Sequence, residues 1–367
     1  MGINNLLQYI KKKYAHLLIN EHISYFSYTR IYIDISGFIY KYMCVSGKTN
    51  GEWLIQIIKL MSMFKQNCIQ IIPIFDGTPP PEKKMEADTR SNARTVLLDK
   101  IKLFENSLIN YKNCPTSYDF LMSQLNKSKD RVVSLLKPKL IDGRFISKSD
   151  IVILSDMLSK IKKQHIVVTK DDITSLKNLL TSLGITWIQS TSEAESFACY
   201  LTNNDNGESS ICSFDSDSIV YLAQSDKNLV VDVKLDGYCT IINTKELLEE
   251  MELTPLQFVD FAILLGCDYN KHIKVNKIGP VNALKLLKLY NNIEHFPNDV
   301  INKECLLLDR CRELFNPTFE HVDIKTIKFD EQVFYDFCKN LSIDSTNIDI
   351  SAFTNIKTSN FCYTDIE

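Results

Sequence analysis

The sequence lacks the short motifs that identify several classes of enzyme. Its six histidines are dispersed and none belongs to an H-E-x-x-H pair, so zinc hydrolysis by that motif has no support. No G-x-S-x-G is present, which gives no nucleophile for acyl transfer. Gly47, Lys48 and Thr49 resemble the end of a phosphate-binding P-loop, but Tyr42 stands where that motif has its first glycine. An ATP-driven enzyme is therefore not expected.

Long apolar runs and paired cysteines are also missing. No run approaches the roughly 18 apolar residues that span a membrane, and the start, MGINNLLQYIKKK, lacks the order of a signal peptide. The eleven cysteines are scattered without a C-x-x-C pair, and their odd number is against a closed disulfide framework. We therefore expect a soluble, intracellular protein with reduced thiols and no membrane partner.

The formal net charge of −3 is small, but the charge is unevenly distributed along the chain. Residues 1–80 carry +4, residues 81–165 carry +7 and residues 166–367 carry −14. A basic N-terminal half indicates an anionic partner, and nucleic acid is the leading candidate. A solvated basic face without such a partner is the alternative, because charge runs often serve only solvation.

Apolar runs separated by amphipathic segments predict the fold class. RIYIDIS (30–36) and IQIIPIFDG (69–77) indicate strands, and EWLIQIIKLMSMFKQN between them indicates a helix. Helix and strand alternate again after residue 170, where a helix closed by Gly184 is followed by ITWIQ, SEAESFACYLTN, SSICSF and DSDSIVYLAQ. The sequence therefore predicts an α/β fold with a central, mostly parallel sheet flanked by helices.

Breaks in these patterns divide the chain into four parts. Residues 1–94 and 166–300 carry the predicted sheet, including a hairpin that turns at Asp236-Gly237. Residues 95–165 are basic and interrupted by Pro115, Pro138 and Gly143, with helical pieces such as ARTVLLDKIKLFENSL, which indicates an insertion. Residues 301–367 form an acidic, helical extension whose end, IDSTNIDISAFTNIKTSN, we expect to be loosely ordered.

Acidic residues follow the predicted strands where those strands end. They are Asp34, Asp76, Glu193, Glu195 and Asp215. Because the carboxyl ends of parallel strands share one edge of a sheet, we expect these side chains to lie together. Helix capping is the alternative, since Ser192 and Glu195 have the spacing of a capping box. A cap explains one acid, but it does not explain an acid at every strand end.

Carboxylates gathered at one edge repel one another unless cations neutralise them. An all-oxygen ligand set without Cys or His favours a hard ion such as Mg²⁺ or Mn²⁺. Two such ions about 4 Å apart support in-line attack on a phosphodiester, and basic residues nearby supply phosphate contacts. The residues themselves therefore indicate a metal-dependent nuclease.

The same residues lie in blocks that resemble the flap endonucleases of the XPG superfamily, which are Mg²⁺-dependent, structure-specific 5′ nucleases. The resemblance covers residues 1 to about 295 through MGI, IDISGFIYKY, PIFDGTPPPEKK, TSEAES, FDSDSI, and LLGCDY followed by IGP. It implies a PIN-like 5′-nuclease fold with an arch-like insertion and a helix–two-turn–helix at about 254–290. The low-glycine composition, rich in Ile, Lys and Asn, is most similar to the poxvirus branch, which implies the host cytoplasm.

The resemblance implies a role for each matching residue. Two Mg²⁺ ions, which Mn²⁺ can replace, would be bound by Asp34, Asp76, Glu193 and Glu195 and by Asp215, Asp217 and Asp268, several of them through water. Lys83 and Arg90 match catalytic basic residues that contact the scissile phosphate at the base of the arch. Arg94 lies one helical turn beyond Arg90 and could share its face. The DNA contacts implied in this way are Gly2, Tyr40, Lys83, Arg90, Arg94, Lys277, Gly279 and Lys285.

Some of these residues have a structural alternative. Tyr40 matches an aromatic residue that stacks on the base next to the cut, but it could also be a core tyrosine. Lys83 and Arg90 could form a solvated helix face. In the helix–two-turn–helix the family has Gly-Ile-Gly and often a bound K⁺, whereas this chain has Lys277-Ile278-Gly279. Bound K⁺ and the charge of Lys277 in its place both stay open.

The leading hypothesis is a DNA endonuclease and 5′ exonuclease that acts at flaps, nicks or branched junctions during viral replication, repair or recombination. An RNA-directed metal nuclease and a catalytically dead scaffold that binds junctions are the alternatives. The prolines in the insertion leave open whether a 5′ flap threads through it. No Q-x-x-L-x-x-F-F motif is present, so recruitment by a sliding clamp is not expected, and the oligomeric state stays open.

Overall fold

The computed structural model describes residues 2–48, 51–113, 166–270, 278–297, 303–345 and 348–354, together with Ile301 and isolated positions between 152 and 162. The chain forms two compact units. The larger unit comprises residues 1–42, 49–86 and 168–367, and the smaller unit comprises residues 43–48 and 87–167. Among the described residues, no helix is both long enough and apolar enough to cross a lipid bilayer.

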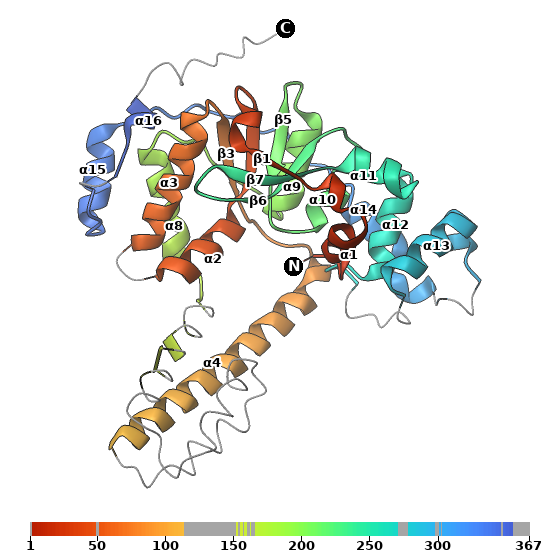
Figure 1. Cartoon of the computed structure of the whole chain (residues 1–367), viewed down its shortest axis with the longest axis horizontal. Helices are drawn as coiled ribbons and strands as arrows, with labels where there is room; N and C mark the ends of the chain where they lie inside the picture. The colour runs from red at the N-terminus through yellow and green to blue at the C-terminus, as the bar shows by residue number, and fades with distance from the viewer. Residues whose placement is uncertain are drawn as a thin grey trace. The chain divides into compact units, whose positions relative to one another are not determined.

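A seven-stranded sheet forms the centre of the larger unit (Figure 1). Its spatial order is β1-β7-β6-β5-β2-β3-β4, and the five strands from β6 to β4 are parallel to one another. β7 pairs antiparallel with both of its neighbours, β6 and β1. The strands are β1 (Ile19–His22), β2 (Arg30–Asp34), β3 (Gln70–Phe75), β4 (Ile188–Gln189), β5 (Ser209–Cys212), β6 (Asn228–Val233) and β7 (Tyr238–Asn243). The predicted α/β class with a mostly parallel sheet is confirmed.

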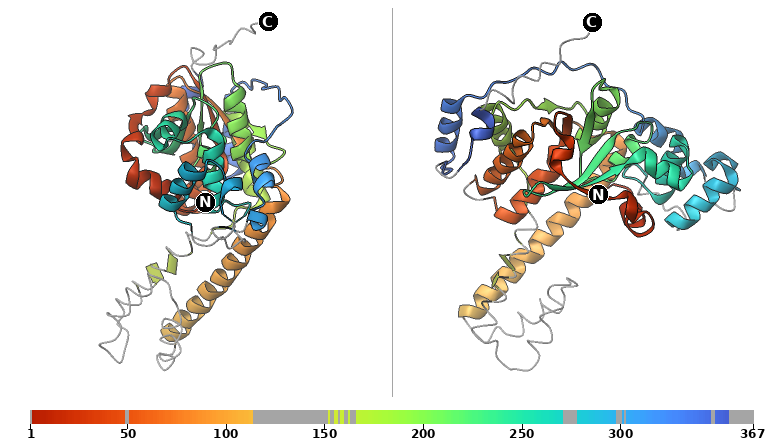
Figure 2. Two further views of the ribbon diagram at one scale, coloured as in Figure 1. Left: turned by 90° about the vertical axis from the view of Figure 1, so that its right-hand side faces the viewer. Right: turned by 45° about the horizontal axis from the view of Figure 1, so that its top comes forward.

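Helices cover both faces of this sheet, so its inner strands are buried on both sides: all four residues of β5 and five of the six residues of β3 are buried. α9 packs on β2, β3 and β5, and α3 packs on β3; Figure 2 shows the sheet between these helices. The helices that precede the C-terminal extension are α1 (Leu6–Lys13), α2 (Ile35–Ser46), α3 (Glu52–Gln66), α4 (Lys84–Asn113), α8 (Lys170–Ser182), α9 (Ala194–Asn204), α10 (Asp217–Tyr221), α11 (Thr244–Met251), α12 (Pro255–Leu265) and α13 (Pro280–Tyr290).

One hydrophobic core joins the N-terminal helix to the helices that follow the sheet. Leu6 and Ile10 of α1 are fully buried in the same cluster as Phe258 and Phe261 of α12. Each such side chain contributes about 1.5–3 kcal/mol by leaving water. The core therefore holds the N-terminus beside α12, far from it in sequence.

Local signals set the ends of several predicted elements. Thr169 and Asp172 form a capping box at the start of α8, and Thr254 and Gln257 form another at the start of α12. The hairpin between β6 and β7 turns at Gly237, whose φ of +88° favours glycine. These elements agree with the sequence prediction, although β4 covers only the last two residues of the predicted strand ITWIQ.

The helical piece predicted at ARTVLLDKIKLFENSL lies within a longer helix. α4 is one helix of 30 residues, seen as the long orange helix in Figure 1. No proline or glycine lies between Lys84 and Asn113, so nothing in the sequence interrupts it. The predicted breaks at Pro115, Pro138 and Gly143 lie outside the described residues.

The C-terminal extension is more ordered than the sequence predicts. It contains α14 (Leu308–Leu314), α15 (Glu331–Asn340) and α16 (Ser351–Thr354), of which α15 packs on α8 and α16 packs on α3. In the segment expected to be loose, Ile343 is 5% exposed and Ala352 is 6% exposed. Two apolar residues of the described part are therefore buried and α16 packs on α3, so this part is more ordered than the sequence predicts. Residues 346–347 and 355–360 of that segment lie outside the described residues.

Candidate functional site

The predicted carboxylates meet at the carboxyl edge of the parallel strands. Asp34 is the last residue of β2, Asp76 follows β3 directly, and Asp215 follows β5. β5, β2, β3 and β4 are parallel neighbours, so their ends share one edge. Glu193 and Glu195, after β4, reach the same place at the start of α9, and Asp217 opens α10. Asp268, just after α12, is 1% exposed.

Hydrogen bonds from the strand ends orient the first of these acids. Asp34 accepts from the backbone N–H of Ser36 at 3.1 Å and from the hydroxyl of Ser213 at 3.2 Å. The hydroxyl of Ser36 in turn donates to Asp76. Ser36, at the start of α2, and Ser213, after β5, therefore both hold Asp34, and Ser36 also contacts Asp76; sequence reasoning missed this role of the two serines.

The predicted capping box of Ser192 and Glu195 is not formed. Glu193 is the N-cap residue of α9 and its side chain makes no capping hydrogen bond. The backbone N–H of Ala194 donates instead to Oδ1 of Asp76 at 2.9 Å, and that of Ser192 donates to the hydroxyl of Ser190 at 3.0 Å. Because the helix start is satisfied by these groups, the carboxylates of Glu193 and Glu195 are available for other contacts.

Lys83 places its ammonium among three of the acids. Its Nζ contacts Glu193, lies 3.2 Å from Oε1 of Glu195 and lies 3.6 Å from Oδ2 of Asp268. The lysine side chain is 12% exposed, so these contacts lie in a largely water-excluded place. The sequence predicted Lys83 beside a phosphate, and the structure places it inside the carboxylate cluster.

Burial raises the pKa of several of these carboxyl groups. The pKa of Asp34 is raised to about 7, first by burial and then by the charge of Asp76. Burial also raises the pKa of Glu195 and Asp217 well above the usual range, with the charge of Asp215 as the next cause in both. Burial therefore favours the neutral carboxyl form of these groups, and nearby positive charge favours the carboxylate.

The chemistry of this cluster fits a hard divalent cation. Asp217 is fully buried, and neither of its carboxylate oxygens has a hydrogen-bond partner. An ionised carboxylate left in this state is costly unless a cation binds it. Among the described residues, no three His, Cys, Asp or Glu side chains converge closely enough to hold one metal ion. The positive charge that the structure places in the cluster is the ammonium of Lys83.

Gly2 lies against the loop that carries two of the acids. Its φ is +79°, and a Cβ atom added there would lie 2.0 Å from Oδ1 of Asp215 and 2.8 Å from Oδ1 of Asp217. The next two residues are held by their backbone N–H groups, from Ile3 to the hydroxyl of Ser216 at 2.9 Å and from Asn4 to the carbonyl of Gly266 at 3.1 Å. No other residue fits at position 2 without displacing an acid.

The remaining predicted DNA contacts lie on other elements and stay predictions. Tyr40 on α2 is 38% exposed, which rules out the alternative that it is a core tyrosine. Arg90 and Arg94 lie one turn apart on α4, in the part that belongs to the smaller unit, and both are half-buried. Gly279 precedes α13, on which Lys285 is exposed, and Lys277 lies outside the described residues. The question of K⁺ therefore stays open.

Two tyrosines that sequence reasoning missed also belong to this site. Tyr269 donates its hydroxyl hydrogen to Oε2 of Glu193 at 3.0 Å, and its hydroxyl is hydrogen-bonded to that of Tyr221. The position of Tyr269 directly after Asp268 was a usable signal. Tyr221 gave none, because its place at the end of the apolar helix α10 is typical of a core residue.

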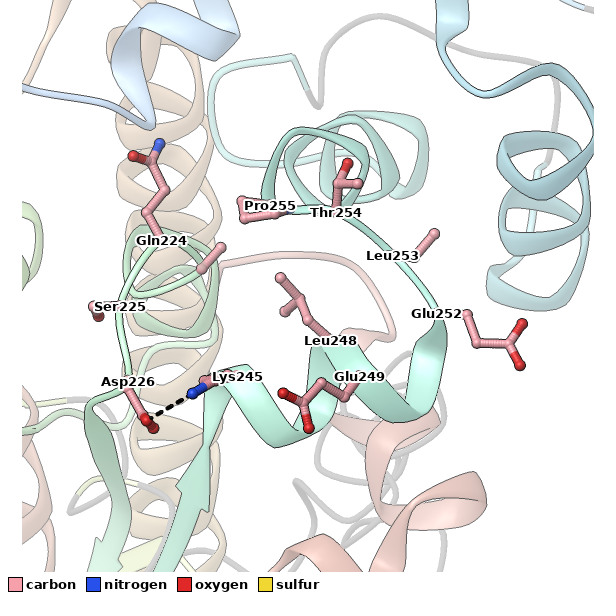
Figure 3. A pocket seen from close by; sticks show the side chains of 11 residues that line it. Gln224, Ser225, Asp226, Lys245, Leu248, Glu249, Glu252, Leu253, Thr254 and Pro255 are labelled. Atoms are coloured by element: carbon pink, nitrogen blue, oxygen red, sulfur yellow. Dashed lines mark hydrogen bonds and ion pairs between the residues drawn. The ribbon is translucent and has the colours of Figure 1, made fainter.

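A pocket of about 570 Å³ lies on a different part of the larger unit (Figure 3). Its lining includes Asp226, Lys245, Leu248, Glu249 and Leu253, from the loop after α10 and from α11 and its end. None of the seven predicted carboxylates lines it. Asp226 and Lys245 form an ion pair at 3.0 Å in this pocket, drawn as a dashed line in the figure. This pocket is therefore separate from the carboxylate edge of the sheet.

Comparison with known proteins identifies the class. The XPG N-terminal domain matches residues 1–96 and the XPG I-region matches residues 184–268. Together these two segments contain all seven carboxylates and Lys83. Both matched segments are those of the XPG superfamily, and the similarities support a flap-endonuclease-like nuclease of that superfamily.

Curated relatives match most of the chain. A probable RAD2-like endonuclease of Invertebrate iridescent virus 3 is 29% identical over 319 residues, which cover 82% of this chain and 82% of the relative. Flap endonuclease 1 of Zea mays is 25% identical over 347 residues, which cover 90% of this chain and 79% of the relative. The predicted membership of the poxvirus branch is not shown by these similarities.

Solved structures share the fold. The catalytic core of Rad2 in complex with a DNA substrate has a TM-score of 0.56 at 14% identity and covers 94% of this chain and 98% of its own. The flap endonuclease of Methanococcus jannaschii has a TM-score of 0.52 at 17% identity and covers 89% of this chain and 92% of its own. At these identities the likeness establishes the architecture, and the roles of individual residues come from the site itself.

Proposed function

We propose that the protein cleaves DNA phosphodiester bonds at flaps, nicks or branched junctions, as a 5′ flap endonuclease and 5′ exonuclease that depends on Mg²⁺. The observation that carries this proposal is the meeting of seven acids at one sheet edge, with Asp217 left without a partner among them. Viral relatives named as endonucleases support a role in viral DNA replication, repair and recombination. The DNA in the complex of the Rad2 core supports DNA as the substrate.

In this proposal the acids would hold two divalent ions, with Asp34, Asp76, Glu193 and Glu195 on one side and Asp215, Asp217 and Asp268 on the other. When bound, the ions would supply positive charge to the phosphate and activate the attacking water. Lys83 lies close enough to these acids to donate a hydrogen bond to a phosphate oxygen at the same place. Arg90 would contact the scissile phosphate as well, Arg94 and Lys285 would contact other phosphates, and Tyr40 would stack on a base.

The test is cleavage by Asp215→Asn and Asp217→Asn on flap, nicked, gapped, double-strand-end and four-way DNA with Mg²⁺. Both variants keep the side-chain shape but lose a negative charge, so we expect them to bind branched DNA and to lose cleavage. Asp226→Asn is the matched control, because Asp226 is an exposed aspartate paired with Lys245.

Three other outcomes decide between the alternatives. Undiminished cleavage by both variants would contradict the proposal. Faster cutting of a matched RNA flap than of the DNA flap would favour an RNA-directed nuclease. Tight binding of junctions by the wild-type protein without cleavage in Mg²⁺ or Mn²⁺ would favour a catalytically dead scaffold.

A further inference from the structure

Two buried tyrosines extend the carboxylate cluster into the interior of the larger unit. Tyr269 donates to Glu193, and its hydroxyl is hydrogen-bonded to that of Tyr221. The exposed fraction is 1% for Tyr269 and 5% for Tyr221. Because a hydroxyl has one hydrogen and Tyr269 gives it to the carboxylate, its oxygen accepts the hydrogen of Tyr221. Hydrogen bonds therefore run in one direction, from Tyr221 through Tyr269 to Glu193.

The C-terminal extension supplies the wall behind these tyrosines. Phe315 directly follows α14, and its ring centroid lies 5.3 Å from that of Tyr221 and 5.4 Å from that of Tyr269. Phe315 is 4% exposed, so the three rings form one buried aromatic group. The matched XPG I-region ends at residue 268, before Tyr269 and well before Phe315.

A second contact ties α14 to the segment that carries Lys83. The Nε of Arg310 donates to Oε1 of Glu82 at 2.7 Å, and its Nη1 donates to Oε2 of Glu313 at 3.0 Å. Glu82 and Lys83 are consecutive residues of the short 3₁₀ helix Pro81–Lys83. The Arg310–Glu82 ion pair therefore fixes the backbone from which Lys83 reaches the carboxylates.

We propose that Tyr221 and Tyr269 are positioning residues for the carboxylate of Glu193. In this proposal Phe315 holds the two tyrosine rings by packing against them, and α14 holds the segment of Lys83 through Arg310. This inference rests on the proposed function, in which Glu193 binds a divalent ion. One oxygen of Glu193 is held by Lys83 and the other by Tyr269. When a ligand of this kind loses the hydrogen bond that orients it, metal affinity falls by about 10- to 100-fold.

The first test is calorimetric titration of the full-length, DNA-free protein with Mn²⁺. Tyr269→Phe removes one hydroxyl and keeps the ring, so we expect Mn²⁺ to bind about 10-fold more weakly. Tyr221→Phe acts one hydrogen bond further away, and we expect a loss of about 3-fold. Phe315→Leu, which loosens the packing behind both rings, is expected to weaken binding by a similar factor.

Tyr200→Phe is the matched control. The hydroxyl of Tyr200 donates to the carbonyl of Phe319 at 3.1 Å, so it too fastens the C-terminal extension to the core, but it has no bond to a carboxylate. We expect this variant to bind Mn²⁺ as the wild-type protein does. Its thermal midpoint shows how much stability such a hydroxyl provides without any role at the site.

The second test separates the position of Lys83 from DNA binding. Arg310→Gln breaks the contact to Glu82, and we expect a several-fold lower single-turnover rate at saturating flap DNA with unchanged DNA affinity. Lys245→Gln, which breaks the exposed ion pair with Asp226, is the control and is expected to change neither.

The inference is overturned if Tyr269→Phe and Tyr221→Phe both bind Mn²⁺ with wild-type affinity. It is also overturned if their only effect is a lowered thermal midpoint like that of Tyr200→Phe, which would show a purely structural role. Failure of the proposed function is recognised separately, as a wild-type protein that cuts no flap or junction. The Mn²⁺ titration still decides the positioning roles in that case.

Discussion

Two groups of charged residues in the larger unit each surround a largely buried cation and are built differently. In the first, Lys83 lies among Glu193, Glu195 and Asp268. In the second, which joins α12 to α14, Arg312 contacts Asp260 and Glu294. Both have one cation, and the side chain of that cation is 12% exposed in the first and 18% in the second.

The difference lies in whether the charges are satisfied. Arg312 reaches both oxygens of the fully buried Asp260, at 2.8 Å and 2.7 Å, and also binds Glu294, so the second group is closed. The first group adjoins the fully buried Asp217, whose carboxylate oxygens have no hydrogen-bond partner. In the second group, the chain itself supplies a partner for both oxygens of the buried Asp260. Beside the first group, the carboxylate of Asp217 has no such partner, and a bound cation would supply the missing positive charge.

The largest expected effect separates the two groups by activity. Lys83→Gln removes the cation of the first group and should lower the cleavage rate by about 10²- to 10³-fold, because a donor aimed at the reacting phosphate is lost. Quench-flow cleavage of a 5′ flap in Mg²⁺ measures it. A wild-type rate in this variant would place Lys83 outside the machinery of cleavage.

The opposite result is expected for the second group. Arg312→Leu leaves Asp260 buried without its partner, which should lower the free energy of unfolding by about 3–5 kcal/mol. Denaturant unfolding in Mg²⁺ measures the loss, and the cleavage rate per folded molecule should stay at the wild-type level. A variant as stable as the wild-type protein would show that the two groups do not differ in this way.

A smaller effect is expected at the edge of the first group. Gly2→Ala adds a Cβ atom where only 2.0 Å is available to Asp215 and where φ is positive, so the acid or the N-terminus must shift. We expect Mn²⁺ affinity to fall by about 10-fold, measured by calorimetry. Gly279→Ala is the control, since nothing lies within 4 Å of a Cβ atom at that position; equal Mn²⁺ affinity in both variants would contradict the expectation.

The smallest expected effect concerns pH. Arg312 lowers the pKa of Glu294 from its ordinary value of 4.5, chiefly by a hydrogen bond. The stability from this contact is therefore present above pH 4.5 and is lost as the pH falls through the lowered pKa. Between pH 5 and pH 3, Glu294→Gln should lose less stability than the wild-type protein, by at most about 1 kcal/mol, because Glu294 is half-exposed. Identical pH profiles would contradict this sign.

Much of the carboxylate cluster around the first group could be predicted from the sequence, because most of its acids follow strands. Asp34 and Asp76 end apolar runs, and parallel pairing brings such ends together whatever the details of packing. The capping box failed for a related reason, since Ser192 and Glu195 have the right spacing but Asp76, from another strand, takes the helix N–H. The spacing of residues along the chain predicts local hydrogen bonds only. It does not reveal an acceptor from another strand, such as Asp76, that competes for the same N–H group.

The supporting residues could not be predicted in this way. Tyr221 and Phe315 are in contact only because α14 folds back against α10 and the end of α12. No motif in either segment predicts this contact. Lys83 was recognised as a basic residue near a phosphate, but its insertion among Glu195 and Asp268 depends on tertiary packing. Hydrophobic periodicity predicts which face of a helix or strand is buried, but it does not predict which other element packs against that face.

The anchoring of the N-terminus has a consequence for the growing polypeptide. Residues 3 and 4 are synthesised long before their partners, since the hydrogen bond from Ile3 to Ser216 spans 213 positions and the backbone N–H of Asn4 donates to Gly266. Asp268 and then Phe315 follow later still on the ribosome. A nascent chain therefore carries Asp34, Asp76, Glu193 and Glu195 before the partners of residues 3 and 4 exist.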